Sequence, residues 1–132
     1  MMVDQGYSVR RATLSRTDCV DLLSLATLAR VVISVRCLPA ALPARICVVD
    51  GQHLLVASTE VAMILAARRG DVLSVQIDGL EADGVTWSVM ASGLASAANT
   101  AENLPDVMRL ALLRGATIIS LPLSVVVGER IG

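Results

Sequence analysis

The chain has 132 residues, which is enough for a single domain with its own core. Its formal net charge of −1 excludes a strong basic field, so we expect no nucleic-acid partner. The apolar fraction of 55% is high, but charged, polar or Pro residues interrupt every long apolar stretch, and we expect no membrane-spanning helix. The excess of apolar side chains instead favours burial between subunits, and therefore an oligomer.

The scarce residue types limit the chemistry that the chain can perform. All eleven basic residues are Arg, so a Schiff-base lysine and a lysine general base are both excluded. The spacing of Cys19, Cys37 and Cys47 fits no zinc site, and their apolar surroundings predict three buried, reduced thiols. No HExxH, EF-hand or His/Cys cluster occurs, so no dedicated metal site is expected. The N-terminal residues lack the apolar segment of a signal peptide, which, together with the thiols, predicts a cytoplasmic protein.

The first elements can be placed from polar signals. Residues 1–13 are mixed and polar and are predicted to form an N-terminal arm or a first short strand, whereas residues 14–132 are predicted to form one domain. A helix is expected at residues 15–25. Ser15 and Asp18 form a pair that resembles a capping box, and an acidic residue favours a helix N-terminus.

Three strands are then expected around two connections. Alternating and β-branched residues predict a strand at 29–35. The following CLPAALP contains two prolines, which predict a turn without regular pairing. Strands at 45–49 and 52–57 are joined by Asp50 and Gly51, a dipeptide typical of a β-hairpin.

A second helix and two long strands are expected in the middle of the chain. Thr59 can cap a helix over residues 59–69, and Gly70 is a suitable stop. The strands at 72–78 and 86–96 alternate in polarity, and a polar, Gly-containing connection joins them. This is the pattern of adjacent antiparallel strands.

The last part of the chain predicts one more helix and one more strand. A polar break at 99–103 precedes an amphipathic helix at 105–114. A strand at 117–121 is ended by Pro122, and a short extended tail follows at 124–130. The total is about six strands and three short helices. Strands this apolar favour a mainly β, antiparallel barrel that is closed or nearly closed, because closure hides the strand edges.

Catalytic patterns are scarce. His53 is the only histidine, and its place within a predicted strand favours a partly buried structural residue. No GxSxG nucleophile elbow, GxGxxG loop or Walker motif is present, so the catalytic residues stay unknown and a nucleotide needs another means of binding.

The order of the segments is more informative than any single motif. A Pro-initiated strand ends in an Asp-Gly hairpin, a Ser-Thr turn precedes a helix, a strand ends in Asp, a strand reads TWSVMASGLA, and the tail reads GERI. These segments lie at residues 43–51, 58–59, 75–78, 86–95 and 128–131. In this order they resemble the pyridoxamine 5′-phosphate oxidase-like family of FMN-binding split barrels, and above all its small actinobacterial members. The resemblance extends from about residue 14 to residue 131.

The resemblance implies a six-stranded, Greek-key split barrel that forms a homodimer with FMN at the interface. It implies that Arg45, Ser58 and Thr59 meet the flavin phosphate or ribityl chain, which agrees with the affinity of arginine and hydroxyl groups for phosphate. The strand with Trp87 and Ser88 is implied to lie close to the dimer interface and the cofactor. Alternative roles stay open: Arg45 as a solvated charge or ion pair, the two hydroxyls as a helix cap, and Trp87 as packing.

One departure from the family pattern concerns the phosphate. The family's helix carries a basic residue where this chain has Val61, Ala62 and Met63, and loss of such a contact lowers affinity about tenfold to a hundredfold. The first hypothesis is therefore an FMN-dependent oxidoreductase of unknown substrate. A second is a non-enzymatic dimer that has lost FMN, in which Met63→Lys restores affinity. A third is a barrel that binds a deazaflavin or haem, with His53 as axial ligand.

Overall fold

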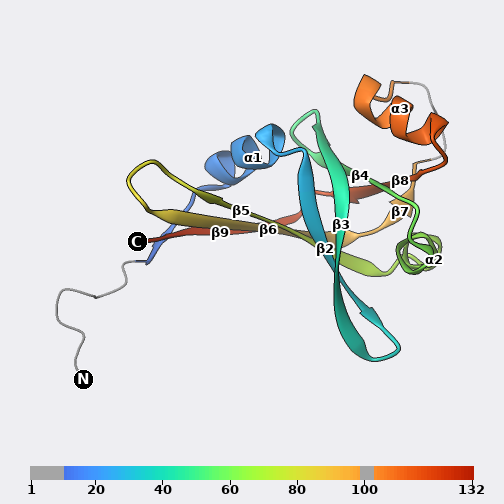
Figure 1. Cartoon of the computed structure of the whole chain (residues 1–132), viewed down its shortest axis with the longest axis horizontal. Helices are drawn as coiled ribbons and strands as arrows, with labels where there is room; N and C mark the ends of the chain where they lie inside the picture. Colours follow the sequence, from blue (N-terminus) through green and yellow to red (C-terminus); the bar gives the residue numbers. More distant parts are fainter. Residues whose placement is uncertain (1–10, 99–102) are drawn as a thin grey trace.

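One continuous antiparallel sheet of nine strands organises the protein (Figure 1). The computed structural model describes residues 11–98 and 103–132, and all statements on structure refer to these residues. The strand order is β1-β9-β6-β5-β2-β3-β4-β8-β7. The elements are β1 Arg11–Thr13, α1 Arg16–Leu25, β2 Leu28–Val35, β3 Leu38–Val49, β4 His53–Ser58, α2 Val61–Arg69, β5 Val72–Leu80, β6 Thr86–Leu94, β7 Ser96–Ala97, α3 Asp106–Leu113, β8 Thr117–Pro122 and β9 Val125–Ile131.

The predicted class, a mainly β antiparallel fold with three helices, is confirmed, but the predicted count of six strands is too low. The additional strands are β1, β7 and β9. The first two have three and two residues, and they are strands only because they pair with β9 and β8. The predicted tail is strand β9, which pairs with β6 along seven residues. The expectation of an arm or a first short strand at residues 1–13 already allowed β1. Pairing between distant segments creates β7 and β9, and local sequence does not report it.

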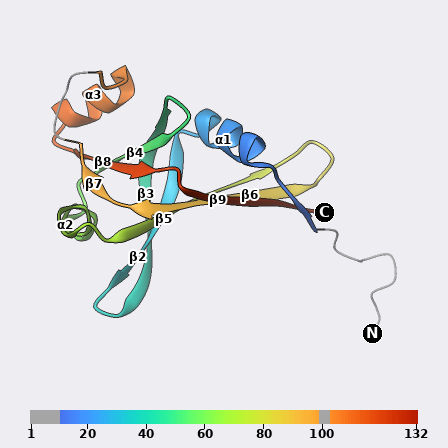
Figure 2. The same ribbon diagram turned by 180° about the vertical axis from the view of Figure 1, so that it is seen from behind.

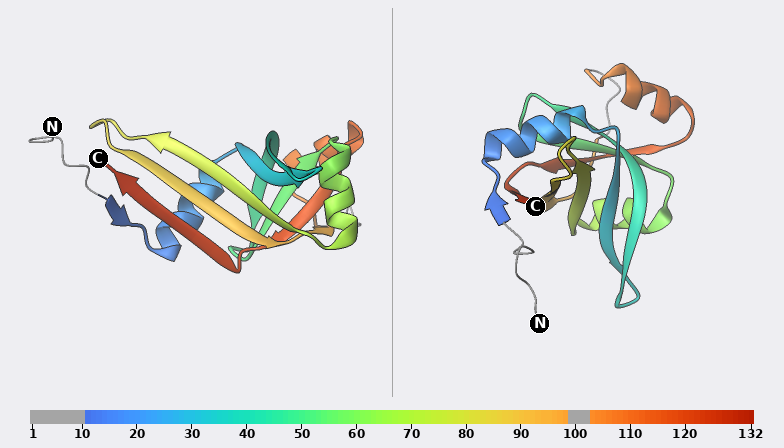
Figure 3. Two further views of the ribbon diagram at one scale, coloured as in Figure 1. Left: turned by 90° about the horizontal axis from the view of Figure 1, so that it is seen from below. Right: turned by 60° about the vertical axis from the view of Figure 1, so that its left-hand side comes forward.

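The sheet curls so that its inner face encloses a core. β6 and β8 are not neighbours in the strand order, yet they approach closely at Gly93, where a Cβ atom would lie 2.6 Å from the carbonyl oxygen of Pro122. Helix α1 lies across β9 and β6 on this inner face and contributes Cys19 and Leu23 to the core (Figure 3). The result is a barrel that is only partly closed.

The turn expected at CLPAALP is wrong, because β3 runs through it from Leu38 and pairs with β2 throughout. Ile46 donates its backbone N–H to the carbonyl of Thr27 over 3.1 Å. Since hydrogen-bonded pairs alternate in an antiparallel ladder, Pro39 and Pro43 occupy positions whose missing N–H groups would point away from β2. β4 pairs only with the later part of β3, so this side is an open edge that tolerates proline. The β2–β3 hairpin projects beyond the rest of the sheet (Figure 1).

Helix α2 begins later than expected. Its N-cap is Glu60 rather than Thr59, and no side chain caps it. The stop at Gly70 is as predicted: this residue has φ of 72°, and its N–H bonds to carbonyls of the last turn. The helix α1 is capped as predicted, because Ser15 Oγ accepts the backbone N–H of Asp18 over 3.1 Å. The polar break predicted at 99–103 lies mostly outside the described residues.

Two separate hydrophobic clusters fill the interior. The main core lies between the inner face of the sheet, α1 and α2. The second, which we call the α3 core, lies between α3 and the outer face of β4 and β8 (Figure 2). Its buried members are Leu55, Ala57, Leu104, Met108 and Ile118. Helix α3 is therefore fixed to the barrel by a cluster of its own.

The environment of the cysteines differs from the expectation. Only Cys19 is buried; Cys37 is exposed and Cys47 is intermediate, and all three are free thiols. Cys37 lies in the β2–β3 turn with φ of 66°, where the hairpin projects away from the core. Among the described residues, no helix has the length and apolar character needed to cross a membrane.

Candidate functional site

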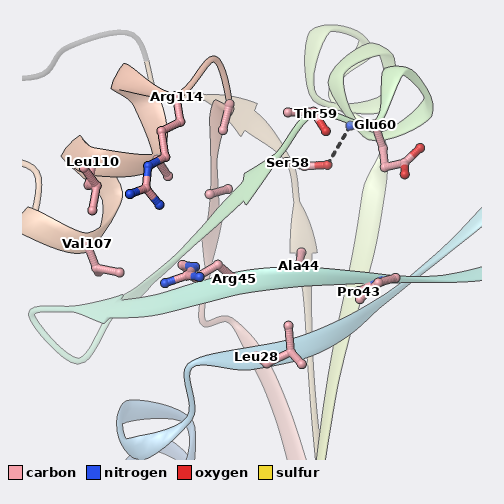
Figure 4. Close-up of a pocket in the computed structure, with 13 residues that line it drawn as sticks. Leu28, Pro43, Ala44, Arg45, Ser58, Thr59, Glu60, Val107, Leu110 and Arg114 are labelled. Carbon is pink, nitrogen blue, oxygen red and sulfur yellow. Dashed lines mark hydrogen bonds between the residues drawn. The ribbon is translucent and has the colours of Figure 1, made fainter.

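A pocket of about 350 Å³ lies between the middle of β3, the end of β4, the start of α2 and helix α3 (Figure 4). It is lined by charged and hydroxyl groups and also by apolar side chains. The polar and charged members are Arg45, Ser58, Thr59, Glu60 and Arg114, and the larger apolar ones are Leu28, Pro43, Val107 and Leu110. The pocket thus brings together three of the residues singled out from the sequence and adds Arg114.

The alternation of β3 directs Arg45 into this pocket. Its neighbours Ala44 and Ile46 are buried in the main core, so Arg45 points to the outer face of the sheet. It pairs with Leu28 on β2 and with Ala57 on β4. Ala57 belongs to the α3 core, so the strand position of Arg45 is fixed relative to α3.

Ser58 and Thr59 are at the junction of β4 and α2, with different roles. Ser58 is 6% exposed, and its Oγ accepts the backbone N–H of Glu60 over 2.9 Å. This bond starts the chain on its path into α2 and leaves the hydroxyl hydrogen of Ser58 as a donor. Thr59 is exposed at the pocket rim, and its hydroxyl has no hydrogen-bond partner within the described part of the chain.

Arg114 reaches the pocket from the C-terminal end of α3. Its backbone is held because Gly115, with φ of 93°, ends the helix: Gly115 donates to the carbonyl of Leu112 over 3.1 Å, and Ala116 donates to Ala111 over 3.0 Å. This pair of bonds is the Schellman arrangement. The Arg-Gly pair marks the helix end in the sequence, but no sequence signal indicates that this end lies beside β3. Arg114 was therefore missed as a site residue.

The electrostatics of the pocket are positive. Figure 4 shows the guanidinium groups of Arg45 and Arg114 on the same side of the pocket, with the Glu60 carboxylate directed away from them. Neither guanidinium has an ion pair or side-chain hydrogen bond among residues 11–98 and 103–132. Other arginines of the chain are paired with carboxylates, namely Arg11, Arg69, Arg109 and Arg130. The pocket can therefore bind an anion through charge-assisted hydrogen bonds.

The other residues singled out from the sequence lie elsewhere. Met63 is 0% exposed in the main core, so it presents no atom to the pocket. Trp87 and Ser88 lie on β6 and border a different pocket of about 480 Å³ near Leu80. Trp87 packs against the main core and covers Gly79, where a Cβ atom would lie 2.1 Å from its ring.

His53 is at the start of β4, next to the hairpin. It is exposed rather than partly buried as expected, and its Nδ1 lies 3.5 Å from Oδ1 of Asp50. It does not line the pocket that contains Arg45. No group of three or more potential metal-ligating side chains occurs in the part of the chain that the structure describes.

Comparison with protein families identifies the chain. The family model described as pyridoxamine 5′-phosphate oxidase matches residues 15–115, which run from α1 to the end of α3 and include the strands β2 to β7. The chain belongs to this family. The predicted resemblance is confirmed. The matched region contains all the residues that line the Arg45 pocket except Ala116, and it therefore includes Arg114. Comparison with curated proteins found no match.

Solved structures of several bacterial proteins share the fold of this family member. A FAD-binding protein from Mesorhizobium loti has a TM-score of 0.72 and 20% identity, over 95% of this chain and 99% of the other. The FAD-binding protein from Mycobacterium smegmatis has a TM-score of 0.69 and 20% identity, over 92% and 98%. The FAD and heme binding protein from Mycobacterium smegmatis has a TM-score of 0.64 and 17% identity, over 90% and 72%. At these identities the likeness establishes the split-barrel fold.

Proposed function

We propose that this protein binds a flavin nucleotide, FMN, in the Arg45 pocket and acts as a flavin-dependent oxidoreductase. The observation that carries the proposal is the pocket itself, which combines two arginines without ion-pair partners among the described residues and two hydroxyl residues with an apolar wall. Membership of the family and the FAD-binding proteins of the same fold support a flavin.

The residues of the pocket fit an amphiphilic phosphate ester. Arg45 and the hydroxyls of Ser58 and Thr59 would hold the phosphate and the start of the ribityl chain. Leu28 and Pro43 would face an apolar ring system, as apolar side chains do in most small-molecule sites. The volume of about 350 Å³ is at the lower end of such sites, so part of a flavin would extend beyond this pocket.

A bound flavin supplies the redox chemistry, and the protein supplies binding and orientation. The arginines would anchor the phosphate end, and the apolar wall would exclude water from one side of the ring. None of the residues that line the pocket is a histidine, cysteine or tyrosine, and the one carboxylate, Glu60, points away from the arginines in Figure 4.

We propose that the working unit is a homodimer, in the cytoplasm. Exposed apolar side chains occur on the outer face of β2, β5, β6 and β9, at Leu28, Val72, Leu94, Val125 and Val127. Exposed apolar side chains on one face of a sheet support an interface. Since Leu28 also lines the Arg45 pocket, a second copy on this face would extend the pocket.

The oligomeric state tests the dimer. Sedimentation of the wild type should give twice the chain mass of 13.8 kDa. Val127→Asp should give the monomer, because it places a charge in the apolar face, whereas Ala82→Asp in an exposed turn should leave the dimer intact. A wild-type protein that sediments as a monomer at micromolar concentration would contradict the dimer.

An absorption spectrum tests the flavin. The purified protein, before or after addition of FMN and gel filtration, should show a flavin band that co-elutes with the protein. Arg45→Ala should reduce the retained flavin, since it removes a charge-assisted contact. A colourless protein that retains none of the added FMN would rule out the proposal.

The absence of a basic residue from the start of α2 favours a second candidate, a barrel that has lost the cofactor. The first turn of α2 has Val61, Ala62 and Met63, and the last of these is buried. This candidate predicts a dimer that binds no flavin. The haem alternative lacks such support, because His53 is exposed and outside the pocket.

A further inference from the structure

We infer that Arg114 is a phosphate-binding residue of this pocket and takes the place of the basic residue that α2 lacks. That the ligand is a flavin rests on the proposed function. That the ligand carries a phosphate group is argued from the residues of the pocket. The phosphate could belong to FMN or to the diphosphate of FAD.

The first argument is position. Arg45 on β3 and Arg114 at the end of α3 line one pocket from two different elements, and the hydroxyls of Ser58 and Thr59 line it from a third, the junction of β4 and α2. A planar guanidinium offers several donors to the oxygens of one phosphate, and two such groups can bind different oxygens. The arrangement surrounds an anion from three elements of the fold.

The second argument is the electrostatic cost. Two like charges that share a pocket repel one another, and this repulsion is relieved when an anion binds between them. No described acidic side chain serves this purpose, because the Glu60 carboxylate points away. Arg109, on the same helix as Arg114, is by contrast neutralised by Asp106 over 3.2 Å. Unpaired arginines occur elsewhere in the described chain, as at Arg68, but only Arg45 and Arg114 line this pocket.

The third argument is preorganisation. The Schellman bonds of Gly115 and Ala116 fix the backbone of Arg114, and Met108, which is fully buried in the α3 core, fixes the helix against β4 and β8. The C-terminal end of a helix carries a partial negative charge, so the backbone there does not attract an anion. The contribution must come from the guanidinium side chain of Arg114.

The test compares ligands with and without a phosphate. FMN, FAD and riboflavin are titrated, with flavin fluorescence as the readout, because riboflavin has the same ring and ribityl chain but no phosphate. Arg114→Ala should weaken FMN or FAD binding about tenfold to a hundredfold, and riboflavin binding less than about twofold. Arg114→Lys, which keeps the charge, should fall between Arg114→Ala and the wild type. The ligand that loses more affinity in Arg114→Ala identifies the phosphate source.

The matched control is Arg68→Ala, which removes the same charge from the far end of α2, outside the pocket. It should leave the affinities for all three ligands unchanged. Thermal unfolding of each variant without ligand checks that the fold is retained. If Arg114→Ala and Arg68→Ala lower FMN affinity equally, or if riboflavin loses as much as FMN, the role of Arg114 is overturned.

A second measurement separates this inference from the flavin proposal. Inorganic phosphate is titrated into the flavin-free protein, and the arginine side-chain Nε–H signals are followed by NMR. We expect the Arg114 signal to shift with phosphate, and the shifts of Arg45 to weaken in Arg114→Ala. If the wild type binds no flavin but shows these phosphate shifts, the proposed function fails and the inference stands. If flavin binds and neither measurement depends on Arg114, the inference fails alone.

Discussion

The substitution Met63→Lys distinguishes two accounts of the start of α2. The family pattern suggests that a basic residue there restores phosphate binding. The structure predicts the opposite, because Met63 is 0% exposed and surrounded by the main core. The new ammonium would point into apolar side chains rather than into the Arg45 pocket. We therefore expect loss of stability without gain of flavin affinity.

The size of the loss follows from the pKa of a buried amine. Full burial lowers the pKa of a lysine side chain by about three to five. A pKa difference of about 1 between the folded and unfolded states corresponds to a free energy of about 1.36 kcal/mol. The amine can shed its proton on folding, so the ionisation loss at pH 7 cannot exceed the cost of deprotonation from about 10.4, and it is about 4–5 kcal/mol. A typical domain has a total stability of about 5–15 kcal/mol. Between the lowered folded-state pKa and about 10.4, only the unfolded state binds the proton, so the stability of the variant rises with pH relative to the wild type.

Urea unfolding of the wild type and Met63→Lys at pH 7 and pH 9 measures both effects. The stability difference should narrow by about 2–2.7 kcal/mol between these two pH values. Met63→Leu, which keeps the volume, should cost less than about 1.5 kcal/mol, and Met63→Gln should be destabilising without the pH dependence. A stable Met63→Lys protein with no such pH dependence and with higher FMN affinity would refute the reasoning.

Four further predictions concern packing and the thiols. Gly79→Ala should shift the fluorescence of Trp87, the only tryptophan, because the added methyl would lie 2.1 Å from its ring; an unchanged spectrum would contradict this contact. Gly128→Ala should cost about 1–3 kcal/mol in urea unfolding, since its Cβ would lie 2.7 Å from Cys19 Sγ. Iodoacetamide should label Cys37 in the native protein, but Cys19 only after unfolding. Burial, and to a lesser extent Asp18, raises the pKa of the Cys19 thiol, so stability should fall as pH rises above about 8.5, and rapid native labelling of Cys19 would argue against its burial.

Much of the fold could be predicted because local signals and tertiary structure agree. The cap at Ser15 depends on a side-chain oxygen that accepts a backbone N–H, and the structure has it. The stop at Gly70 and the Asp50–Gly51 hairpin depend on positive φ angles that few residue types adopt, and the structure has both. The strand through Pro39 and Pro43 could not be predicted. β4 pairs only with residues 45–49 of β3, so the earlier part of β3 has no neighbour on that side among the described residues. At such an open edge, the missing N–H of a proline breaks no hydrogen bond of the sheet.

The candidate site could be predicted only in part, for a similar reason. Arg45, Ser58 and Thr59 lie on segments that the hairpin brings together, and their order along the chain matches a family pattern. Arg114 comes from a helix that docks through the α3 core, and nothing in its own sequence reports that contact. The side-chain direction of Met63 depends on how α2 packs, which the family pattern does not specify for this chain.

The existence of two hydrophobic cores has a consequence for the lifetime of the pocket. Arg45 and Ser58 belong to the barrel, whereas Arg114 depends on the five buried residues of the α3 core. A small cluster opens more often than a large one, so amide protons of α3 should exchange with deuterium by local opening, and those of β5 and β6 only by global unfolding. A ligand that contacts both parts slows the exchange of α3 by the factor that its concentration and Kd determine. Binding of a ligand in the pocket and docking of α3 on the barrel are thus linked equilibria, and a ligand that contacts both parts stabilises the docked position of α3.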